Sequence, residues 1–171
     1  MPVTKAFLAE FENEAQTTRR VLERVPTDKL SWRPHPKSMS LGTLAMHVAT
    51  SPGVIHGWAL DDVTEFGGSG GSPEPKSTTE IVAAHDQSVA RVKEILSGMS
   101  DEDVHKPWQA RPKGSEQVLF TMPKIALLRT LGLNHTYHHR GQLSVYLRLL
   151  DVPVPSIYGP SADENPFAAR T

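Results

Sequence analysis

The sequence of 171 residues contains no cysteine. This absence excludes disulfide bonds, metal sites with thiolate ligands and enzymes with a cysteine nucleophile. No apolar run reaches the length of a membrane span, and residues 1–5 lack the hydrophobic stretch of a signal peptide. A net charge of −1 and a pI near 6.7 provide no broad basic surface for nucleic acid or an anionic membrane. We therefore expect a soluble cytoplasmic protein without nucleic-acid or membrane partners.

Four segments show the apolar periodicity of amphipathic helices, and none shows the strict alternation of a strand. The first ends before Pro26, Ser40 can cap the second, and Ser77 with Glu80 can form a capping box for the third. The fourth is expected over about residues 123–150. This pattern predicts an all-α protein, an antiparallel four-helix bundle that forms a single domain over residues 1–171.

Two segments of the chain could alter this predicted bundle, one inside the second helix and one after it. Ser51-Pro52 indicates either a kink in the second helix or the start of a new short helix, because proline suits a first turn. The glycine-rich residues 67–75 are expected to form a flexible connector, since neither a preceding strand nor a following Gly-Lys-Ser/Thr indicates a phosphate loop. The length of this connector permits a crossover between the second and third helices.

The sequence NHTYHHRGQL at residues 134–143 places three histidines in the fourth predicted helix. His135 and His139 are four residues apart, so a helix directs both imidazoles toward one point. Neutral imidazole is the commonest protein ligand for zinc, nickel and related ions. His138 points about 100° away from His139, so we expect it to line a pocket or to support a ligand by a hydrogen bond. The pair supplies two metal ligands, and a third must come from another helix.

A helical wheel predicts that the histidine run faces the bundle interior. Arg140 falls on the opposite side, where an ion pair or an interface contact is expected rather than a catalytic role. Unpaired buried imidazoles are costly, and a metal ion would satisfy them together. The expected inward-facing set is Leu128, Leu131, His135, His138, His139, Gln142, Tyr146 and Leu149.

Two further histidines compete for the place of third ligand. His47 lies at the edge of the apolar stripe of the second helix, whereas His85 lies nearer the centre of the stripe of the third. Periodicity does not choose between them. The alternative is a set of hydrogen-bonded core histidines without a metal, which a pattern of two histidines does not exclude. For His35, His56 and His105, which have no partner at ligand spacing, we expect surface or loop roles.

The residues exclude two familiar classes of hydrolase. A zinc metalloprotease of the His-Glu-x-x-His type needs a glutamate after the first histidine, and that position is Thr136. The Gly-x-Ser-x-Gly turn of a serine hydrolase is absent from the sequence. The sequence leaves the catalytic residues, including the general base, unassigned.

Several motifs occur in a common order along most of the chain. They are WRP at residues 32–34, LAMH at 44–47, HHRGQL at 138–143, YLR at 146–148, VP at 154–155 and YGPS at 158–161. Together they resemble the DinB/YfiT-like superfamily of bacterial helical bundles. This resemblance implies a four-helix bundle, a homodimer, and a divalent ion, nickel or zinc, held by His47, His135 and His139. It selects His47 over His85, which periodicity cannot do.

The resemblance implies two alternative functions. The first is a metal-dependent enzyme of the thiol S-transferase or hydrolase type, acting on a small molecule with a low-molecular-weight thiol such as bacillithiol or mycothiol. The second is a non-catalytic metal-binding stress-response protein that acts through dimerisation. A pocket beside the ion would favour the enzyme, and a site sealed by Trp32, Trp58 or the chain end would favour the binder. The residues expected to line such a pocket are His138, Gln142, Tyr146 and His85.

Overall fold

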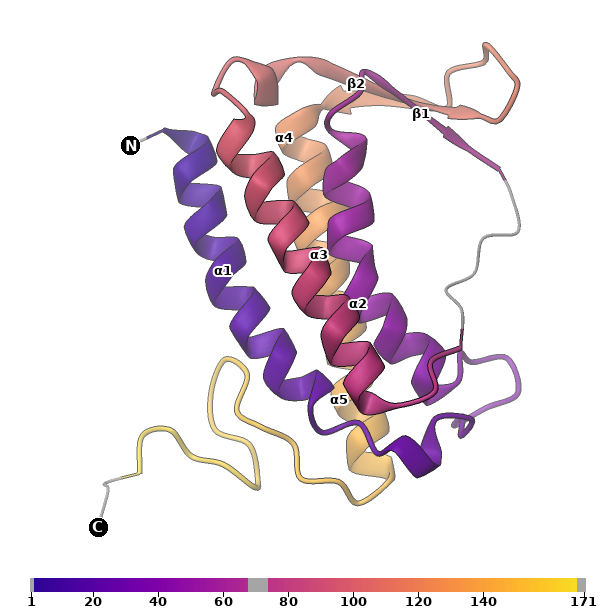
Figure 1. Ribbon diagram of the computed structural model, residues 1–171, viewed down its shortest axis with the longest axis vertical. Coiled ribbons are helices and arrows are strands. Elements are labelled where there is room, and N and C mark those ends of the chain that lie inside the picture. The colour runs from indigo at the N-terminus through magenta and orange to yellow at the C-terminus, as the bar shows by residue number, and fades with distance from the viewer. Residues whose placement is uncertain (1, 68–73, 169–171) are drawn as a thin grey trace.

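The computed structural model describes residues 2–67 and 74–168, which form a bundle of long helices with a small sheet across one end (Figure 1). Within these residues, no helix combines the length and apolar character that spanning a membrane requires. The fourth helical segment is continuous but changes its winding near the middle. The long helices are α1 (Val3–Leu22), α2 (Leu41–Trp58), α3 (Thr78–Gly98) and the succession α4 (Lys124–Leu127), η3 (Leu128–Asn134) and α5 (His135–Leu149); η1 (Thr27–Lys29) and η2 (Asp103–His105) are single turns.

Three short strands form the sheet, so the protein is mostly helical and the all-α description is too narrow. β1 (Val63–Phe66) runs parallel to β2 (Pro107–Pro112), which runs antiparallel to β3 (Phe120–Pro123). The expectation that the chain contains no strand is wrong. The strands have four to six residues, and β2 and β3 include prolines at their ends, so they show no run of alternating apolar residues. The fully buried Trp108 anchors β2 to the bundle, and its indole N–H donates to Thr64 Oγ1 at 2.9 Å.

The helices α2 and α3 run in the same direction, so the antiparallel prediction is wrong for this pair. Near their beginnings, Ser40 Oγ donates to Glu74 Oε1 at 2.6 Å. Further along both helices, the Gly53 backbone N–H donates to Ser88 Oγ at 2.8 Å. The chain leaves α2 at the end where β1 lies and enters α3 at the opposite end (Figure 1). The chain therefore crosses from one end of the bundle to the other between α2 and α3. The expected flexible connector falls mainly on residues 68–73, which lie outside the described residues.

The ends of α2 and α3 follow the sequence expectations closely. Ser40 caps α2, and Ser77 Oγ accepts from the Glu80 backbone N–H at 3.1 Å. The Glu80 carboxylate accepts from the Lys76 N–H at 2.7 Å, one residue before the position in a standard capping box. Pro52 lies inside α2, which continues to Trp58 as one helix rather than starting a new one.

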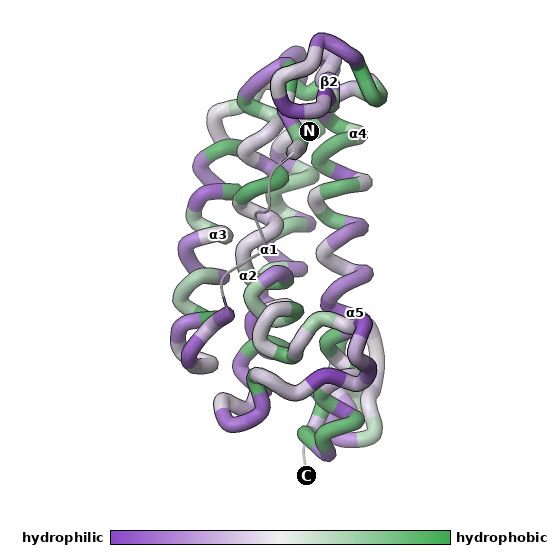
Figure 2. The backbone as a smooth tube through the Cα atoms, turned by 90° about the vertical axis from the view of Figure 1, so that its right-hand side faces the viewer, coloured by the Kyte–Doolittle hydropathy of each residue, from purple (hydrophilic) through white to green (hydrophobic). Residues whose placement is uncertain are grey.

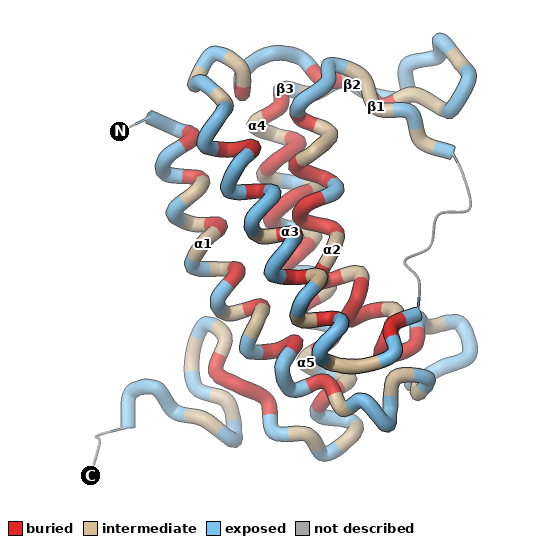
Figure 3. Tube along the Cα trace, viewed as in Figure 1, coloured by how far each residue is buried: buried red, intermediate tan, exposed pale blue. Residues whose placement is uncertain are grey.

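Hydrophobic and polar residues alternate along the helices (Figure 2), and the buried positions follow the inward faces (Figure 3). They form two core clusters. The cluster near the sheet contains Trp108, Leu127 and Leu133, and the cluster at the other end contains Leu143 and Leu147. His135 and His139 fall between these two clusters in the sequence of the last helix. The histidine run therefore lies where the two cores meet, not inside either of them.

Candidate metal centre

Three imidazoles from two helices converge at one point. His47 on α2 and His139 on α5 bring Nε2 to 3.4 and 3.1 Å, respectively, from His135 Nε2. One nitrogen from each ring lies within 4.8 Å of the other two. Two nitrogens bound to one zinc at about 2.0–2.1 Å are about 3.3 Å apart at a tetrahedral angle. The donor type and the spacing therefore fit one shared divalent ion.

The position of the run depends on a wide turn before it. Residues Leu128–Asn134 form a π-helical segment, whose turns contain more residues than an α-helical turn. A helical wheel drawn at about 100° per residue therefore no longer predicts which side chains face inward after this segment. In α5 the positions that face the interior differ by one residue from those on the wheel. The expected inward-facing set is accordingly wrong in part, because His138, Gln142 and Leu149 are exposed. The buried residues of α5 are Thr136, Arg140, Leu143 and Leu147.

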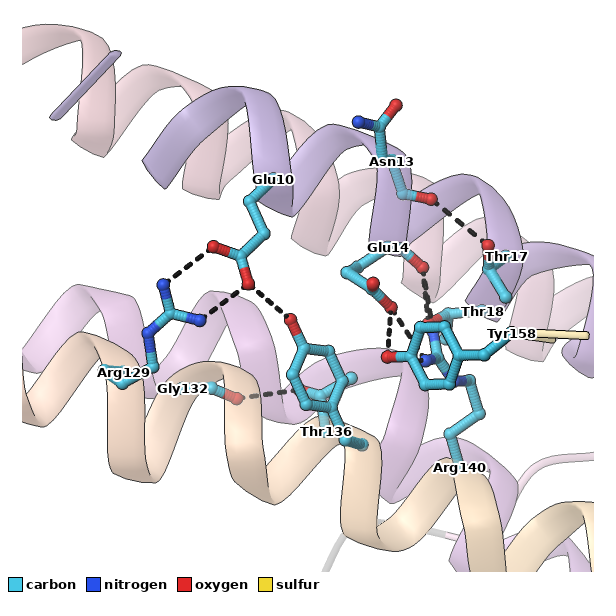
Figure 4. Close-up of polar contacts among 11 residues, drawn as sticks. Glu10, Asn13, Glu14, Thr17, Thr18, Arg129, Gly132, Thr136, Arg140 and Tyr158 are labelled. Atoms are coloured by element: carbon cyan, nitrogen blue, oxygen red, sulfur yellow. Dashed lines mark hydrogen bonds and ion pairs between the residues drawn. The ribbon is translucent and has the colours of Figure 1, made fainter. Parts of the chain in front are cut away.

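The same shift buries Arg140, which the wheel places on the outer side. Figure 4 shows its side chain directed toward Glu14, Thr18 and Tyr158. Its side chain is 1% exposed and forms an ion pair with Glu14 of α1 at 2.7 Å. It also donates to Thr18 Oγ1 at 3.1 Å and to the Tyr158 hydroxyl at 2.6 Å. The expected ion pair is present, although in the interior. Arg140 joins α5, α1 and the C-terminal segment, on a different face of α5 from His139.

The site favours neutral imidazoles. Burial is the main cause that lowers the pKa of His135 to about 4, and the neighbouring His139 and His47 lower it further. Burial likewise lowers the pKa of His47 and of His139 below the ordinary value. His135 Nδ1 is buried without a hydrogen-bond partner in the described structure, so Nε2 makes the polar contacts of this ring. All three rings are therefore in the neutral form that binds metal ions near neutral pH.

Gln142 and His138 both lie next to His139, but they differ in what they contact. Gln142 Oε1 lies 2.8 Å from His139 Nδ1 and can accept the proton of that nitrogen. This hydrogen bond leaves the lone pair of His139 Nε2 directed at the other two rings. His138 is exposed, with its ring centre 4.8 Å from that of His139. Gln142 thus orients the His139 ring, whereas His138 is exposed beside it.

The other two residues expected to line a pocket lie elsewhere. His85 is buried on α3, with Nδ1 3.4 Å from Asp86 Oδ1, and it lines a groove between α1 and α3. It does not belong to the group of three convergent histidines. Tyr146 donates to the Met39 carbonyl at 3.4 Å and packs edge-on against Trp32. Both side chains thus support the packing between helices and loops.

His56 is fully buried, so the expected surface or loop role is wrong. Its Nδ1–H donates to the Pro52 carbonyl at 2.7 Å, and its ring packs against Phe11. Burial lowers its pKa to about 4. The space for the ring exists because residue 132, opposite, is a glycine.

A cavity of about 480 Å³ adjoins His47 and His135. Two of its walls come from α2 and η3, and the third comes from the sheet and the segment before β3. Sequence patterns do not reveal this third wall, because they do not predict the strands that form it. Neither His138, Gln142, Tyr146 nor His85 belongs to the lining, which consists of His47, Thr50, Ser51, Val54, Ile55, Trp58, Phe66, Leu119, Phe120, Leu131 and His135.

Comparisons with known proteins agree with this architecture. A family model described as "DinB family" matches residues 1–166. The uncharacterized protein YrdA of Bacillus subtilis (strain 168) is 29% identical over 162 residues, covering 92% of this chain and 89% of that protein. A DinB-like protein from Bacillus cereus ATCC 10987 gives a TM-score of 0.71 at 27% identity, covering 90% of this chain and 97% of that one. The DinB-like protein YjoA of Bacillus subtilis shares the fold, with a TM-score of 0.65 at 20% identity, covering 85% of this chain and 92% of that one.

Proposed function

The chain belongs to the DinB family, and on that basis we propose that it is a metal-dependent enzyme whose divalent ion, nickel or zinc, is bound by His47, His135 and His139. The convergence of the three Nε2 atoms is the observation that supports this most directly. Three protein ligands leave a coordination position for water or substrate, as in catalytic rather than structural zinc sites. When bound, the ion would act as a Lewis acid that activates water, a thiol or a carbonyl group.

The reaction class that we propose is transfer of a thiol to a small molecule, or hydrolysis. The chain has no cysteine, so a reacting thiol would arrive as a cosubstrate such as bacillithiol or mycothiol. The cavity beside His47 and His135 provides space for a small molecule next to two of the ligands. Gln142 keeps His139 oriented, and Trp58 and Phe66 form an aromatic wall of the cavity.

A non-catalytic metal-binding role is the alternative. Such a role would fit a site closed off by Trp32, Trp58 or the C-terminal segment. Trp58 instead lines the cavity, while Trp32 packs against Tyr146. Tyr158 of the C-terminal segment bonds to Arg140 and Glu14, away from the ligand face. These positions favour the enzyme.

The test combines the metal-loaded protein with bacillithiol, mycothiol or no thiol, and with either monochlorobimane or 4-nitrophenyl acetate. We expect one thiol to accelerate loss of the electrophile, or the ester to be hydrolysed without a thiol. His139→Ala should abolish the activity, and His105→Ala, an exposed histidine away from the site, should leave it unchanged. A folded, metal-loaded protein that accelerates neither reaction would contradict the enzyme and support the binder.

We also propose a homodimer. Val145 and Leu149 lie one turn apart on α5 and are 56% and 58% exposed, which supports packing of a second copy along this helix. Sedimentation equilibrium should give twice the chain mass, and Val145→Glu should give the single-chain mass. A wild-type protein that sediments as a monomer at micromolar concentration would contradict this proposal.

A further inference from the structure

The cavity beside His47 and His135 has mostly apolar walls. Among the described residues that line it there is no aspartate, glutamate, lysine or arginine. Its polar side chains are the two histidines together with Thr50 and Ser51. A charged ligand buried against these walls would lose its hydration without gaining an ionic partner, and that loss is costly. The walls therefore discriminate against ions and favour uncharged molecules.

The aromatic side chains make one wall suited to a flat ligand. Trp58 meets Phe66 edge-on, with ring centres 4.9 Å apart. Trp108 of β2 lies behind them, nearly parallel to Trp58, with Phe120 packed against it. Phe66, Trp108 and Phe120 lie in the paired strands β1, β2 and β3, and Trp58 is the last residue of α2, so regular secondary structure holds the wall in place. Preformed aromatic surfaces bind rings by stacking or edge contacts.

One hydroxyl group in the lining has no partner. Ser51 is 6% exposed, and its Oγ forms no hydrogen bond within the described structure. The adjacent Thr50 differs, since its hydroxyl donates to the Met46 carbonyl at 2.8 Å. A buried polar atom without a partner is uncommon in folded proteins. The Oγ atom is shielded from solvent, so rotation of the Ser51 side chain toward the cavity would give the hydroxyl a partner without breaking an existing hydrogen bond. Ser51 lies one turn after His47, so such a partner would also be near the metal ligands.

From these three observations we propose that the cavity binds an uncharged, largely apolar small molecule with a ring system and one hydrogen-bonding group, which pairs with Ser51. That this molecule is a substrate rests on the proposed metal-dependent function. Binding itself rests only on the walls and on Ser51. The predicted lining residues on α5 play no part in it, and a polar thiol cosubstrate would have to approach the ligands from outside this cavity.

Isothermal titration calorimetry with four probes of similar size tests the proposal. The probes are 1-naphthol, 1-methylnaphthalene, 1-naphthoate and 1-naphthylmethylammonium, each titrated into metal-free and metal-loaded protein. We expect the two uncharged probes to bind at least tenfold more tightly than the two ions in the metal-free protein, and 1-naphthol to bind most tightly. Equal affinity for charged and uncharged probes, or no binding of the uncharged ones, would overturn the proposal.

Two pairs of variants locate the binding. Ser51→Ala should lower the affinity for 1-naphthol by about three- to tenfold, the effect of losing one hydrogen bond. The affinity for 1-methylnaphthalene should stay within about twofold. Thr50→Val removes a hydroxyl that is already hydrogen-bonded within the helix, so it should change the affinity for neither probe. Val54→Glu places a carboxylate in the lining and should abolish binding, whereas Val3→Glu, which replaces a similarly exposed valine outside the cavity, should not. Val54→Glu with unchanged 1-naphthol affinity would show that the probe binds elsewhere and would overturn the proposal.

The metal content of the same samples separates this proposal from the proposed function. Protein that holds nickel or zinc at the three histidines but binds no uncharged probe would overturn the cavity proposal alone. Protein that binds no metal but shows the Ser51-dependent preference for 1-naphthol would support the cavity proposal and contradict the metal-dependent enzyme.

Discussion

Gly132 of η3 packs so closely against His56 of α2 that a Cβ atom at position 132 would lie 2.8 Å from His56 Cε1. Only a residue without a side chain allows this approach. The contact lies three residues before His135, between α2 and the last helical segment, which together carry the three convergent histidines. The glycine therefore allows these two helices to approach closely beside the three-histidine site.

Replacing Gly132 tests this relationship. Gly132→Ala should lower the free energy of unfolding by about 1–3 kcal/mol, because the added methyl group overpacks the contact with His56. It should also weaken metal binding, since α2 and α5 must move apart. Gly141→Ala is the matched control, because a Cβ there meets nothing within 4 Å, and it should stabilise α5 by about 0.5–1 kcal/mol. Urea unfolding measures both, and equal effects of the two variants would contradict the close contact.

The buried His56 ring should make stability depend on pH. Burial lowers the pKa of His56 to about 4, against the weaker opposing effect of its hydrogen bond to Pro52. In the unfolded chain the pKa returns to about 6.5, so between these values the unfolded state binds the extra proton. The contribution is present in full above about pH 6.5 and is lost as the pH falls toward about 4, a change of about 3 kcal/mol.

Urea unfolding of chelator-treated protein at several pH values between about 7.5 and 4 measures this dependence. In the variant His56→Leu, the unfolding free energy should change less steeply with pH, because the contribution of His56 is gone. The contributions of the other buried histidines should remain. Identical slopes for the wild type and the variant would show that His56 does not titrate as its burial requires.

The ion pair between Arg140 and Glu14 should matter far more than its exposed counterparts. Removing one partner of a buried pair leaves the other charge unpaired, so Arg140→Leu should cost about 3–5 kcal/mol of unfolding free energy. Arg19→Leu removes an arginine from a pair with Asp86 in which both side chains are more than 40% exposed. It should shift the urea midpoint much less. Equal shifts would mean that the buried position of Arg140 has no energetic consequence.

Gln142 should tune metal affinity without binding the ion. Gln142→Leu removes the acceptor of the His139 Nδ1 proton, so nickel and zinc affinity should fall by about 10–100-fold. Gln142→Glu keeps an acceptor and should retain most of the affinity. His138→Ala, at the exposed neighbour of His139, should leave affinity within about twofold, because His138 lies outside the ligand group. Competition titrations with a chromophoric chelator measure these affinities. If His138→Ala lowered metal affinity as much as Gln142→Leu, the distinct role of Gln142 would be contradicted.

The sequence predicted the helices better than their arrangement. The periodicity around Leu44 and Val92, and the caps at Ser40 and Ser77, depend on local chemistry that a sequence displays directly. The parallel course of α2 and α3 depends on where a long connection returns, and local patterns do not record that. The winding change at residues 128–134 is equally hidden, because Leu128, Leu131 and His135 have the spacing of an ordinary α-helix. That change moved Arg140 inward and Gln142 outward.

The three convergent histidines could be predicted for a different reason. His135 and His139 display helical spacing, but the choice of His47 over His85 came from the family resemblance and not from periodicity. In the structure His47 faces the pair, whereas His85 lies on α3 beside Asp86. The sequence did not identify Ser51 and Phe120 as cavity residues, since their proximity requires a sheet whose short strands the sequence did not predict.

Metal analysis of the purified protein, loaded with nickel or zinc and then desalted, tests the central claim most directly. We expect about one ion per chain, retained in His85→Ala and His105→Ala and lost in His47→Ala, His135→Ala and His139→Ala. Folded protein that retains no ion after loading, or that loses the ion in His85→Ala but keeps it in His47→Ala, would contradict the three-histidine site.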